Sequence, residues 1–272
     1  MSDKPYLRDI QYKDSRNLAA RINLHQLFGT SRVSFPEWAL DFYGFVSGDK
    51  VLDVGCGTGD FWNAIRKRLP RDLHLTLTDF SPGMLEKCRE VTAGLAARYE
   101  EADVGFLPYQ DGSFDKAVAH FMLYHADSQE KALSELVRVV KPAGMIGIAT
   151  GGDQHMRRLL EVGRSIDQTM PSDYKYGSRF MENAADHLLP KFFRGVAKHG
   201  HDDALKVTDP SPLLEYLRST PTFPSENASF MTAYEAIVLG EIQEKGSFDI
   251  GRRSVLYVCT EPWRQGDVAL GR

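Results

Sequence analysis

The stretch VLDVGCGTG, residues 51–59, decides the fold of this 272-residue chain. Its apolar first half, taken as residues 50–54, is typical of a buried strand, and three glycines follow at alternate positions. Glycine lets the backbone turn tightly and approach a ligand without a Cβ atom in the way. A helix expected at residues 61–69 would present the positive end of its dipole to that ligand. The stretch therefore predicts a strand, a ligand-binding loop and a helix in succession.

Outward from this stretch, short apolar runs alternate with amphipathic segments, which is typical of βαβ units around a parallel sheet. We expect further strands at residues 73–78, 99–103, 114–120 and 145–150, and further helices at 84–98 and 128–140. Residues 196–207 and 254–260 are expected to close the sheet, an antiparallel pair being one option, with a helix at 212–218 between them. Residues 15–28 and 153–193 are helical in pattern and lie outside this alternation.

The composition restricts the kind of protein. Hydrophobic residues make up 42% of the chain, which is ordinary for a globular domain that buries a core. The 33 Lys and Arg against 37 Asp and Glu give a net charge of −4, so the basic excess expected of a nucleic-acid-binding protein is missing. Cys56, Cys88 and Cys259 have no metal-ligand or disulfide-framework spacing. With no secretory signal and no apolar run of about 18–20 residues, we expect a cytoplasmic protein without membrane, nucleic-acid or metal partners.

The glycine loop has two interpretations. Dinucleotide-binding folds use a similar loop, but their fingerprint is G-x-G-x-x-G, and the third glycine here, Gly59, comes one position early. Asp53, two residues before Gly55, also disfavours a pyrophosphate and suits a cationic ligand better. A nicotinamide-dependent oxidoreductase is therefore the weaker alternative.

The segment DVGCGTG at residues 53–59 resembles the first motif of class I S-adenosylmethionine-dependent methyltransferases. Four later segments resemble further motifs of that family in the same order: TDFSPGML at 78–85, EAD at 101–103 with LPY at 107–109, FD at 114–115 and VVKPAG at 139–144. The family usually has a glycine where Ala143 stands, a departure that affects a turn rather than the chemistry. The resemblance covers residues 48–150 and is to the small-molecule type of methyltransferase.

This resemblance implies an α/β fold with a doubly wound, mostly parallel seven-stranded sheet of the Rossmann-like kind. We expect one globular domain with four parts. Residues 1–45 would form N-terminal lid helices, 46–150 the S-adenosylmethionine-binding core, 151–193 a helical substrate-cap insertion after the fifth strand, and 194–272 the completion of the sheet.

The resemblance also implies roles for the residues that match the motifs. Asp53 would hold the methionine ammonium, and Asp79 would accept hydrogen bonds from both ribose hydroxyls. The other implied cofactor contacts are the backbone of Gly55, Cys56, Gly57 and Gly59, then Phe80, Met84 on an adenine face, Asp103 at the adenine amino group, the Val104 N–H, and His120 beneath the methyl group. Helix capping is the alternative for Asp53 and Asp79, and Glu100 and Glu101 are alternatives to Asp103.

Methyl transfer needs a base where the acceptor must lose a proton, as phenols, hydroxyls and activated carbons often must. His120 and His125 are the candidate catalytic bases, because the unperturbed pKa of histidine lies near neutrality. A structural role is the alternative for both. Residues 119–122, AHFM, lack the N/D-P-P-Y/F motif that family members use on planar exocyclic nitrogens, which argues against methylation of nucleic-acid bases or glutamine.

The segments that flank the core are the expected walls of the substrate site. The predicted substrate contacts are Tyr12, Arg16, His25, Arg158 and Tyr176, with Arg21, His155, Arg157, Tyr174 and Phe180 as further candidates. A solvated helix face or core packing is the alternative for the arginines and aromatics. Several arginines converging on the site would indicate an acidic group on the substrate.

The sequence thus favours transfer of a methyl group from S-adenosylmethionine, released as S-adenosylhomocysteine, to an oxygen or carbon atom of a small molecule. A specialised metabolite is one such acceptor. Two alternatives stay open besides the oxidoreductase: a catalytically silent cofactor-binding regulator or partner subunit of the same fold, and a tRNA or protein methyltransferase. The sequence leaves the oligomeric state open.

Overall fold

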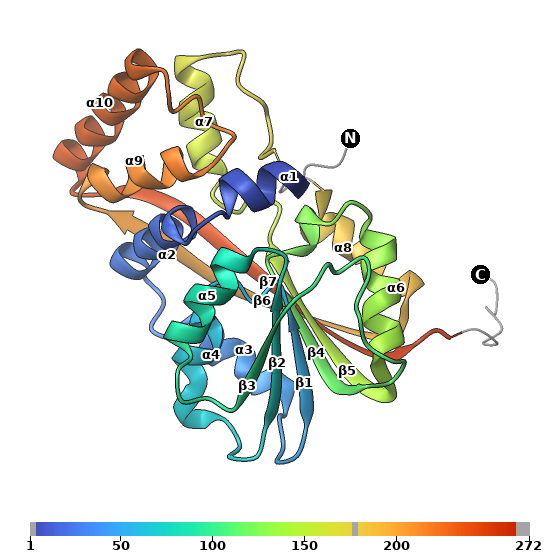
Figure 1. Ribbon diagram of the computed structural model, residues 1–272. Helices are drawn as coiled ribbons and strands as arrows, with labels where there is room; N and C mark the ends of the chain where they lie inside the picture. The colour runs from blue at the N-terminus through green and yellow to red at the C-terminus, as the bar shows by residue number, and fades with distance from the viewer. Residues whose placement is uncertain (1–3, 176–178, 265–272) are drawn as a thin grey trace.

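The fold is built on a seven-stranded sheet (Figure 1). In the computed structural model, which describes residues 4–175 and 179–264, its strands follow the order β3-β2-β1-β4-β5-β7-β6. The first five strands in this order, from β3 through β1 to β5, pair in parallel, whereas β7 is antiparallel to both β5 and β6. The strands are β1 Lys50–Val54, β2 His74–Asp79, β3 Ala97–Glu101, β4 Phe114–His120, β5 Val140–Gly151, β6 Phe193–Val207 and β7 Phe248–Pro262. This confirms the predicted doubly wound, mostly parallel α/β sheet.

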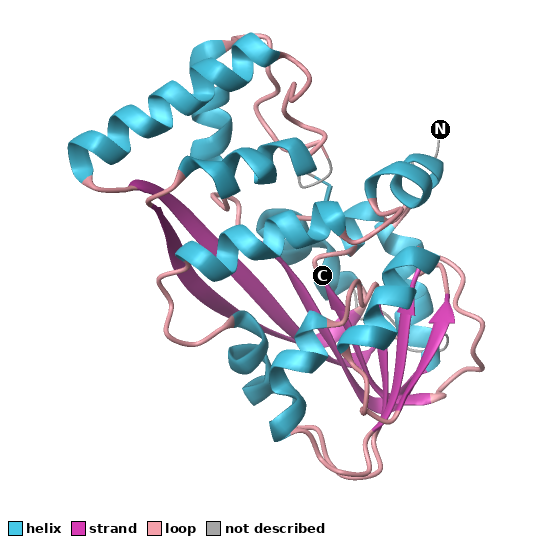
Figure 2. Ribbon diagram, turned by 60° about the vertical axis from the view of Figure 1, so that its left-hand side comes forward, coloured by secondary structure: helices cyan, strands magenta, loops and turns pink. Residues whose placement is uncertain are grey.

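Helices cover both faces of this sheet and gather in a separate group beyond one end of it (Figure 2). None in the described part of the chain is long and apolar enough to cross a membrane. The α-helices are α1 Lys4–Tyr6, α2 Arg16–Phe28, α3 Phe35–Tyr43, α4 Asp60–Ile65, α5 Pro82–Val91, α6 Gln129–Val139, α7 Arg157–Ile166, α8 Glu182–Leu188, α9 Pro210–Ser219 and α10 Ala228–Lys245. Short helical turns are η1 Leu7–Gln11, η2 Arg66–Arg68, η3 Leu123–His125 and η5 Leu189–Lys191.

Strand β1 shows why the central strands are apolar. Successive side chains of a strand point to opposite faces. Val51 belongs to the core that α3, α4 and α5 cover, whereas Leu52 and Val54 belong to the core that α6 and α8 cover. Both faces are therefore dry, and Asp53 is the one charged residue among the four buried residues of β1. A buried carboxylate at the end of a central strand needs a specific partner.

A second hydrophobic core lies beyond the end of the sheet. Strand β5 pairs with β7 only along residues 254–259, but β6 and β7 continue together as an antiparallel pair to Val207 and Phe248. The extended part of this strand pair packs against α2, α7, α9 and α10 (Figure 1). We call these four helices the cap. They come from three separate parts of the chain.

Several predicted boundaries differ from the structure. The helix expected at residues 84–98 ends at Val91, because Gly94 has φ +87° and residues 97–101 pair with β2 as strand β3. Strands β6 and β7 are both longer than expected, at 15 residues each. Helix α10 was not predicted, since its apolar residues do not share one face: Tyr234 and Val238 are buried, while Ile237 and Leu239 are exposed.

The segment expected to form the cap insertion, residues 151–193, lies in two places. Helix α7 joins the cap through Leu159 and Leu160. Helix α8 packs instead on the sheet beside α6, where Ala185 is fully buried. The part of the cap that follows it in sequence, α9 and α10, is inserted between β6 and β7.

Candidate functional site

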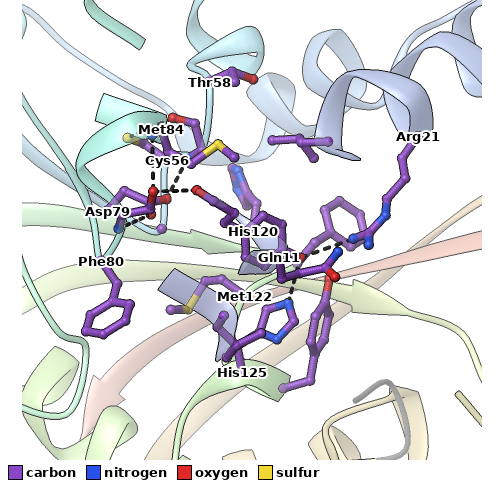
Figure 3. A pocket seen from close by; sticks show the side chains of 18 of the residues that line it. Gln11, Arg21, Cys56, Thr58, Asp79, Phe80, Met84, His120, Met122 and His125 are labelled. Atoms are coloured by element: carbon purple, nitrogen blue, oxygen red, sulfur yellow. Dashed lines mark hydrogen bonds between the residues drawn. The ribbon is translucent and has the colours of Figure 1, made fainter. Parts of the chain in front are cut away.

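A cavity of about 510 Å³ lies at the carboxyl ends of β1, β2 and β4, between the sheet and the cap. The strand order reverses between β1 and β4, and open α/β sheets bind their ligands beside such a switch point. The N-terminal segment, with η1 and α2, forms the opposite wall. Figure 3 shows side chains from both walls pointing into this space.

The glycine loop after β1 forms a tight turn at the base of the cavity. The backbone N–H groups of Gly55 and Cys56 both donate to the carbonyl oxygen of Thr78, at 2.8 Å each. Gly55 has φ +74°, and a Cβ atom there would lie 2.8 Å from the side chain of Met122. A Cβ atom at Gly59 would lie 2.7 Å from Thr92 on the far side of the loop. The loop therefore requires glycine both for its backbone angles and for its close packing.

Asp79 stands at the end of β2 and holds this loop. Its Oδ2 accepts from the Gly57 N–H at 2.9 Å, and its Oδ1 accepts from the Ser81 N–H at 2.8 Å (Figure 3). The N-cap of α5 is Ser81, whose own hydroxyl accepts from Met84, so Asp79 is not the cap of that helix. Burial raises the pKa of Asp79, and its backbone hydrogen bonds oppose that rise. Each carboxylate oxygen keeps a lone pair for a ligand, which fits two vicinal ribose hydroxyls.

Asp53 carries an unsatisfied acceptor in the same cavity. Its Oδ2 accepts from the Trp62 indole N–H at 2.6 Å, whereas its buried Oδ1 has no hydrogen-bond partner within the described residues. The N-cap of the next helix, α4, is Gly59, so Asp53 does not cap it. Burial raises the pKa of Asp53 to about 7, and the nearby Asp79 adds to the rise. An orphaned buried carboxylate oxygen fits the ammonium group of a methionine moiety.

We expect the affinity for S-adenosylhomocysteine to depend on pH through Asp53. An ammonium beside the carboxylate stabilises its charged form, so binding is strongest above the free pKa of about 7 and weakens as pH falls through it. Titration calorimetry should give a dissociation constant about tenfold larger at pH 6 than at pH 8. Asp53→Asn should bind more weakly and show little of this dependence. A variant that keeps the full tenfold change would place the titrating group elsewhere.

The expected adenine contacts line one end of the cavity. Met84 is buried on α5, and Phe80, Asp103 and Val104 lie beside it. Asp103 accepts from the Gly105 N–H at 2.8 Å and forms an ion pair with Lys4 of α1. Its two sequence alternatives do not line the cavity: Glu100 accepts from the Tyr109 hydroxyl, and Glu101 lies near Arg8. Of the three acids, the geometry therefore favours Asp103.

His120, at the end of β4, is enclosed by aromatic side chains. Its Nε2 lies 2.5 Å from the Tyr43 hydroxyl, and its ring contacts Phe35 and Phe61. Burial lowers the pKa of His120 to about 3. The ring is thus neutral, held in one orientation, and forms part of the cavity wall.

His125, in η3, belongs to a hydrogen-bonded chain that crosses the cavity. The Arg21 guanidinium donates to the Tyr12 hydroxyl at 3.1 Å, and that hydroxyl lies 2.9 Å from His125 Nε2. Because the Tyr12 oxygen accepts from Arg21, its own proton is available to point at Nε2. Burial and the charges of Arg21 and Arg179 lower the pKa of His125 to about 3. His125 is therefore an unprotonated acceptor at neutral pH.

The predicted substrate contacts divide into three groups. Tyr12 and His25 line the cavity. Arg16 and Arg158 do not: Arg16 is 88% exposed and pairs with Asp14, and Arg158 pairs with Glu241 on the cap surface. The structure therefore brings neither arginine to this cavity, and their role as substrate contacts gains no support from it. Tyr176 lies outside the described residues.

The further candidates also divide. Arg21, His155 and Tyr174 line the cavity, whereas Arg157 does not and Phe180 is buried in the sheet core. The sequence analysis missed Tyr216 and Arg252, which reach the cavity from α9 and β7. No local signal marks these two residues, because they come from segments that only the fold of the cap brings to the N-terminal helix.

Comparisons with known proteins bear on the core of the chain. The family model described as "Methyltransferase domain" matches residues 51–144. The chain is 37% identical over 123 residues to malonyl-[acyl-carrier protein] O-methyltransferase of Pectobacterium atrosepticum, covering 45% of this chain and 47% of that protein. It is 39% identical over 104 residues to demethylmenaquinone methyltransferase of Staphylococcus aureus, covering 38% and 43%. The chain thus matches just under half the length of these curated relatives.

Solved structures share the fold over most of the chain. A putative methyltransferase of Bacillus halodurans superimposes with a TM-score of 0.60 at 16% identity, covering 84% of this chain and 99% of that one. A Haemonchus contortus phosphoethanolamine N-methyltransferase, solved with phosphomonomethylethanolamine and S-adenosylhomocysteine, has a TM-score of 0.59 at 16% identity, covering 97% and 61%. At these identities the likeness is one of fold.

Proposed function

We propose that this chain transfers a methyl group from S-adenosylmethionine to an oxygen or carbon atom of a small molecule. The match of residues 51–144 to the family model described as "Methyltransferase domain" supports this reaction. One observation carries the proposal. The same cavity contains the carboxylates suited to the cofactor, Asp53 and Asp79, and a neutral histidine, His125, whose Nε2 lies within hydrogen-bond distance of the Tyr12 hydroxyl.

Different residues of the chain would bind different parts of the cofactor. Asp79 accepts from the ribose hydroxyls, Asp53 accepts from the ammonium group through its free oxygen, and the glycine loop admits the ligand against the backbone. Asp103 and Met84 hold the adenine. When bound, S-adenosylmethionine supplies a methyl group on a positively charged sulfur, so the protein need only align the acceptor and exclude water.

The acceptor proton goes to the Tyr12–His125 pair. The acceptor O–H or C–H gives its proton to His125 Nε2, with Tyr12 relaying it: the Tyr12 oxygen receives one proton and passes its own to Nε2. The acceptor electrons thereby become available to form the bond to the methyl carbon. His120 has a positioning role in this proposal, because its Nε2 is engaged by Tyr43, which unlike Tyr12 does not line the cavity, and its ring packs between aromatic neighbours.

The cavity favours a small acceptor that must be deprotonated. Its volume lies within the 300–1,000 Å³ typical of small-molecule sites. The cap and the N-terminal segment line the cavity on the side opposite the sheet. A base assists acceptors such as phenols, enols and activated carbons, whereas a neutral amine can attack without one. The O-methyltransferase among the curated relatives agrees with an oxygen acceptor.

The proposal is tested by measuring S-adenosylhomocysteine release with panels of phenols, β-dicarbonyl compounds and amines. We expect turnover with members of the first two panels and none with the amines. Turnover confined to amines would contradict the assignment of oxygen or carbon. Micromolar binding of S-adenosylhomocysteine with no turnover on any panel would support a cofactor-binding protein without catalysis.

A further inference from the structure

Arg21 is a half-buried cation that faces the cavity without a counterion. Its guanidinium contacts the Tyr12 hydroxyl, the Ser219 hydroxyl and the Ser219 carbonyl oxygen, all of which are uncharged. The rings of Tyr12, Tyr124 and Tyr216 surround it. Within the described residues, no carboxylate lies within ion-pair distance of Arg21. A charge withdrawn from water in this way is costly unless an opposite charge joins it.

The other basic side chains that line the cavity are neutralised. Arg252 pairs with the buried Asp203, and Lys4 pairs with Asp103 and Asp127. Arg21 is therefore the exception among the described lysines and arginines of the cavity. The positive charge at this point is left for a ligand to balance.

The donors of Arg21 match a carboxylate. A guanidinium has five N–H groups, and three of them are engaged by Ser219 and Tyr12. One N–H is left on each of the two terminal nitrogens. Two such donors on one planar fork suit the two oxygens of a carboxylate.

The surroundings of Arg21 belong to the acceptor side of the site. Its hydrogen-bond partners are Tyr12, which directly follows η1, and Ser219 at the end of α9. Figure 3 shows Arg21 and His125 pointing into the same part of the cavity, away from Asp79. Tyr12 bridges Arg21 to His125. An anion at Arg21 would also cancel part of the charge that lowers the pKa of His125, which would make His125 a stronger base.

We propose that Arg21 is a specificity-determining residue that binds a carboxylate of the acceptor, separate from the atom that is methylated. This inference rests on the proposed function. It commits to the acceptor as the source of the carboxylate. The methionine carboxylate of the cofactor has the same chemistry, and the experiment separates the two.

The test uses matched ligands and three variants. Thermal-shift and calorimetric titrations of the S-adenosylhomocysteine-saturated protein would compare a panel of hydroxyaryl and oxo carboxylates with the corresponding amides. Arg21→Met removes the charge, and Arg21→Lys keeps the charge with fewer donors should the first variant fold poorly. Arg16→Met is the matched control on the same helix, because Arg16 is exposed and outside the cavity.

We expect carboxylates to bind more tightly than their amides, and Arg21→Met to weaken them about 10–100-fold while leaving the amides unchanged. Arg21→Lys should fall between, and Arg16→Met should match the wild type. Equal binding of carboxylates and amides, or no binding of any carboxylate, would overturn the inference.

Further measurements distinguish an acceptor carboxylate from the cofactor carboxylate, and the Arg21 subsite from the proposed reaction. A loss of ten-fold or more in affinity for S-adenosylhomocysteine itself in Arg21→Met, with no change for the carboxylate panel, would assign Arg21 to the cofactor and overturn the acceptor subsite. Turnover of uncharged phenols without any carboxylate preference would retain the methyltransferase and reject the subsite. A carboxylate preference that depends on Arg21, without turnover of any acceptor, would retain the subsite and reject the proposed reaction.

Discussion

Replacing His125 with alanine is expected to lower kcat by about 10²–10⁴-fold, the range that general-base catalysis contributes. His125 Nε2 is the end of the Arg21–Tyr12–His125 chain and the unprotonated acceptor in it. The variant should keep its affinity for S-adenosylhomocysteine, because the proposed cofactor residue Asp79 lies on the other side of the cavity from His125 (Figure 3). Single-turnover rates and calorimetry would measure the two effects separately.

Two further variants test this assignment: Tyr12→Phe removes the relay, and His187→Ala is a control. Tyr12→Phe keeps the ring and removes the hydroxyl that relays the proton, so we expect a smaller loss in kcat than for His125→Ala. His187 is an exposed histidine on α8 that hydrogen-bonds its own helix, and its replacement should leave kcat unchanged. Wild-type kcat in His125→Ala, together with a collapse in His120→Ala, would assign the base to His120 instead.

The pH profile distinguishes His125 from Asp53. Since the pKa of His125 lies at about 3 in the protein without acceptor, the base stays unprotonated as pH falls from 8 to 5, and its titration should not reduce kcat/KM for the acceptor at saturating cofactor. The pKa of Asp53 lies at about 7, so the affinity for the cofactor should fall over that same interval. A kcat/KM for the acceptor that falls through pH 7 at saturating cofactor would show that another group supplies the base.

The sheet and the cofactor side of the site could be predicted because their signals are local. Asp53 is the next-to-last residue of β1 and Asp79 the last residue of β2, and a loop or helix start follows each within a few residues. The parallel order of the strands then brings the two carboxylates together at one edge. Tertiary contacts were not needed to find them.

The acceptor side could not be predicted to the same degree, because it depends on which face of a helix meets the cavity. Arg16 and Arg21 are five residues apart on α2, which places them roughly 140° apart around the helix axis. Arg21 enters the cavity and Arg16 faces solvent. Nothing in the sequence of α2 says which face is inward, since that is decided by α9, about 200 residues later in the chain.

Replacing Asp79 with alanine is expected to weaken binding of S-adenosylhomocysteine by at least 100-fold. Two hydrogen bonds from ribose hydroxyls to a charged acceptor are lost, and hydrogen bonds to charged groups contribute about 1.5–3 kcal/mol each. The glycine loop also loses its anchor, because Asp79 Oδ2 accepts from the Gly57 N–H. Titration calorimetry measures the affinity, and thermal unfolding checks that the variant is folded.

Asp79→Asn gives the sharper form of the same test. Both carboxylate oxygens of Asp79 accept from backbone N–H groups, one from Gly57 and the other from Ser81. The amide of asparagine has only one acceptor oxygen, so its NH₂ donor would face the second N–H donor. We therefore expect this nearly isosteric variant to lose most of the affinity as well. Glu100→Gln is the matched control, because Glu100 lies outside the cavity and accepts from Tyr109. An Asp79→Asn dissociation constant within about threefold of the wild type would refute the ribose assignment, because neither the loop nor the ribose would then depend on the carboxylate.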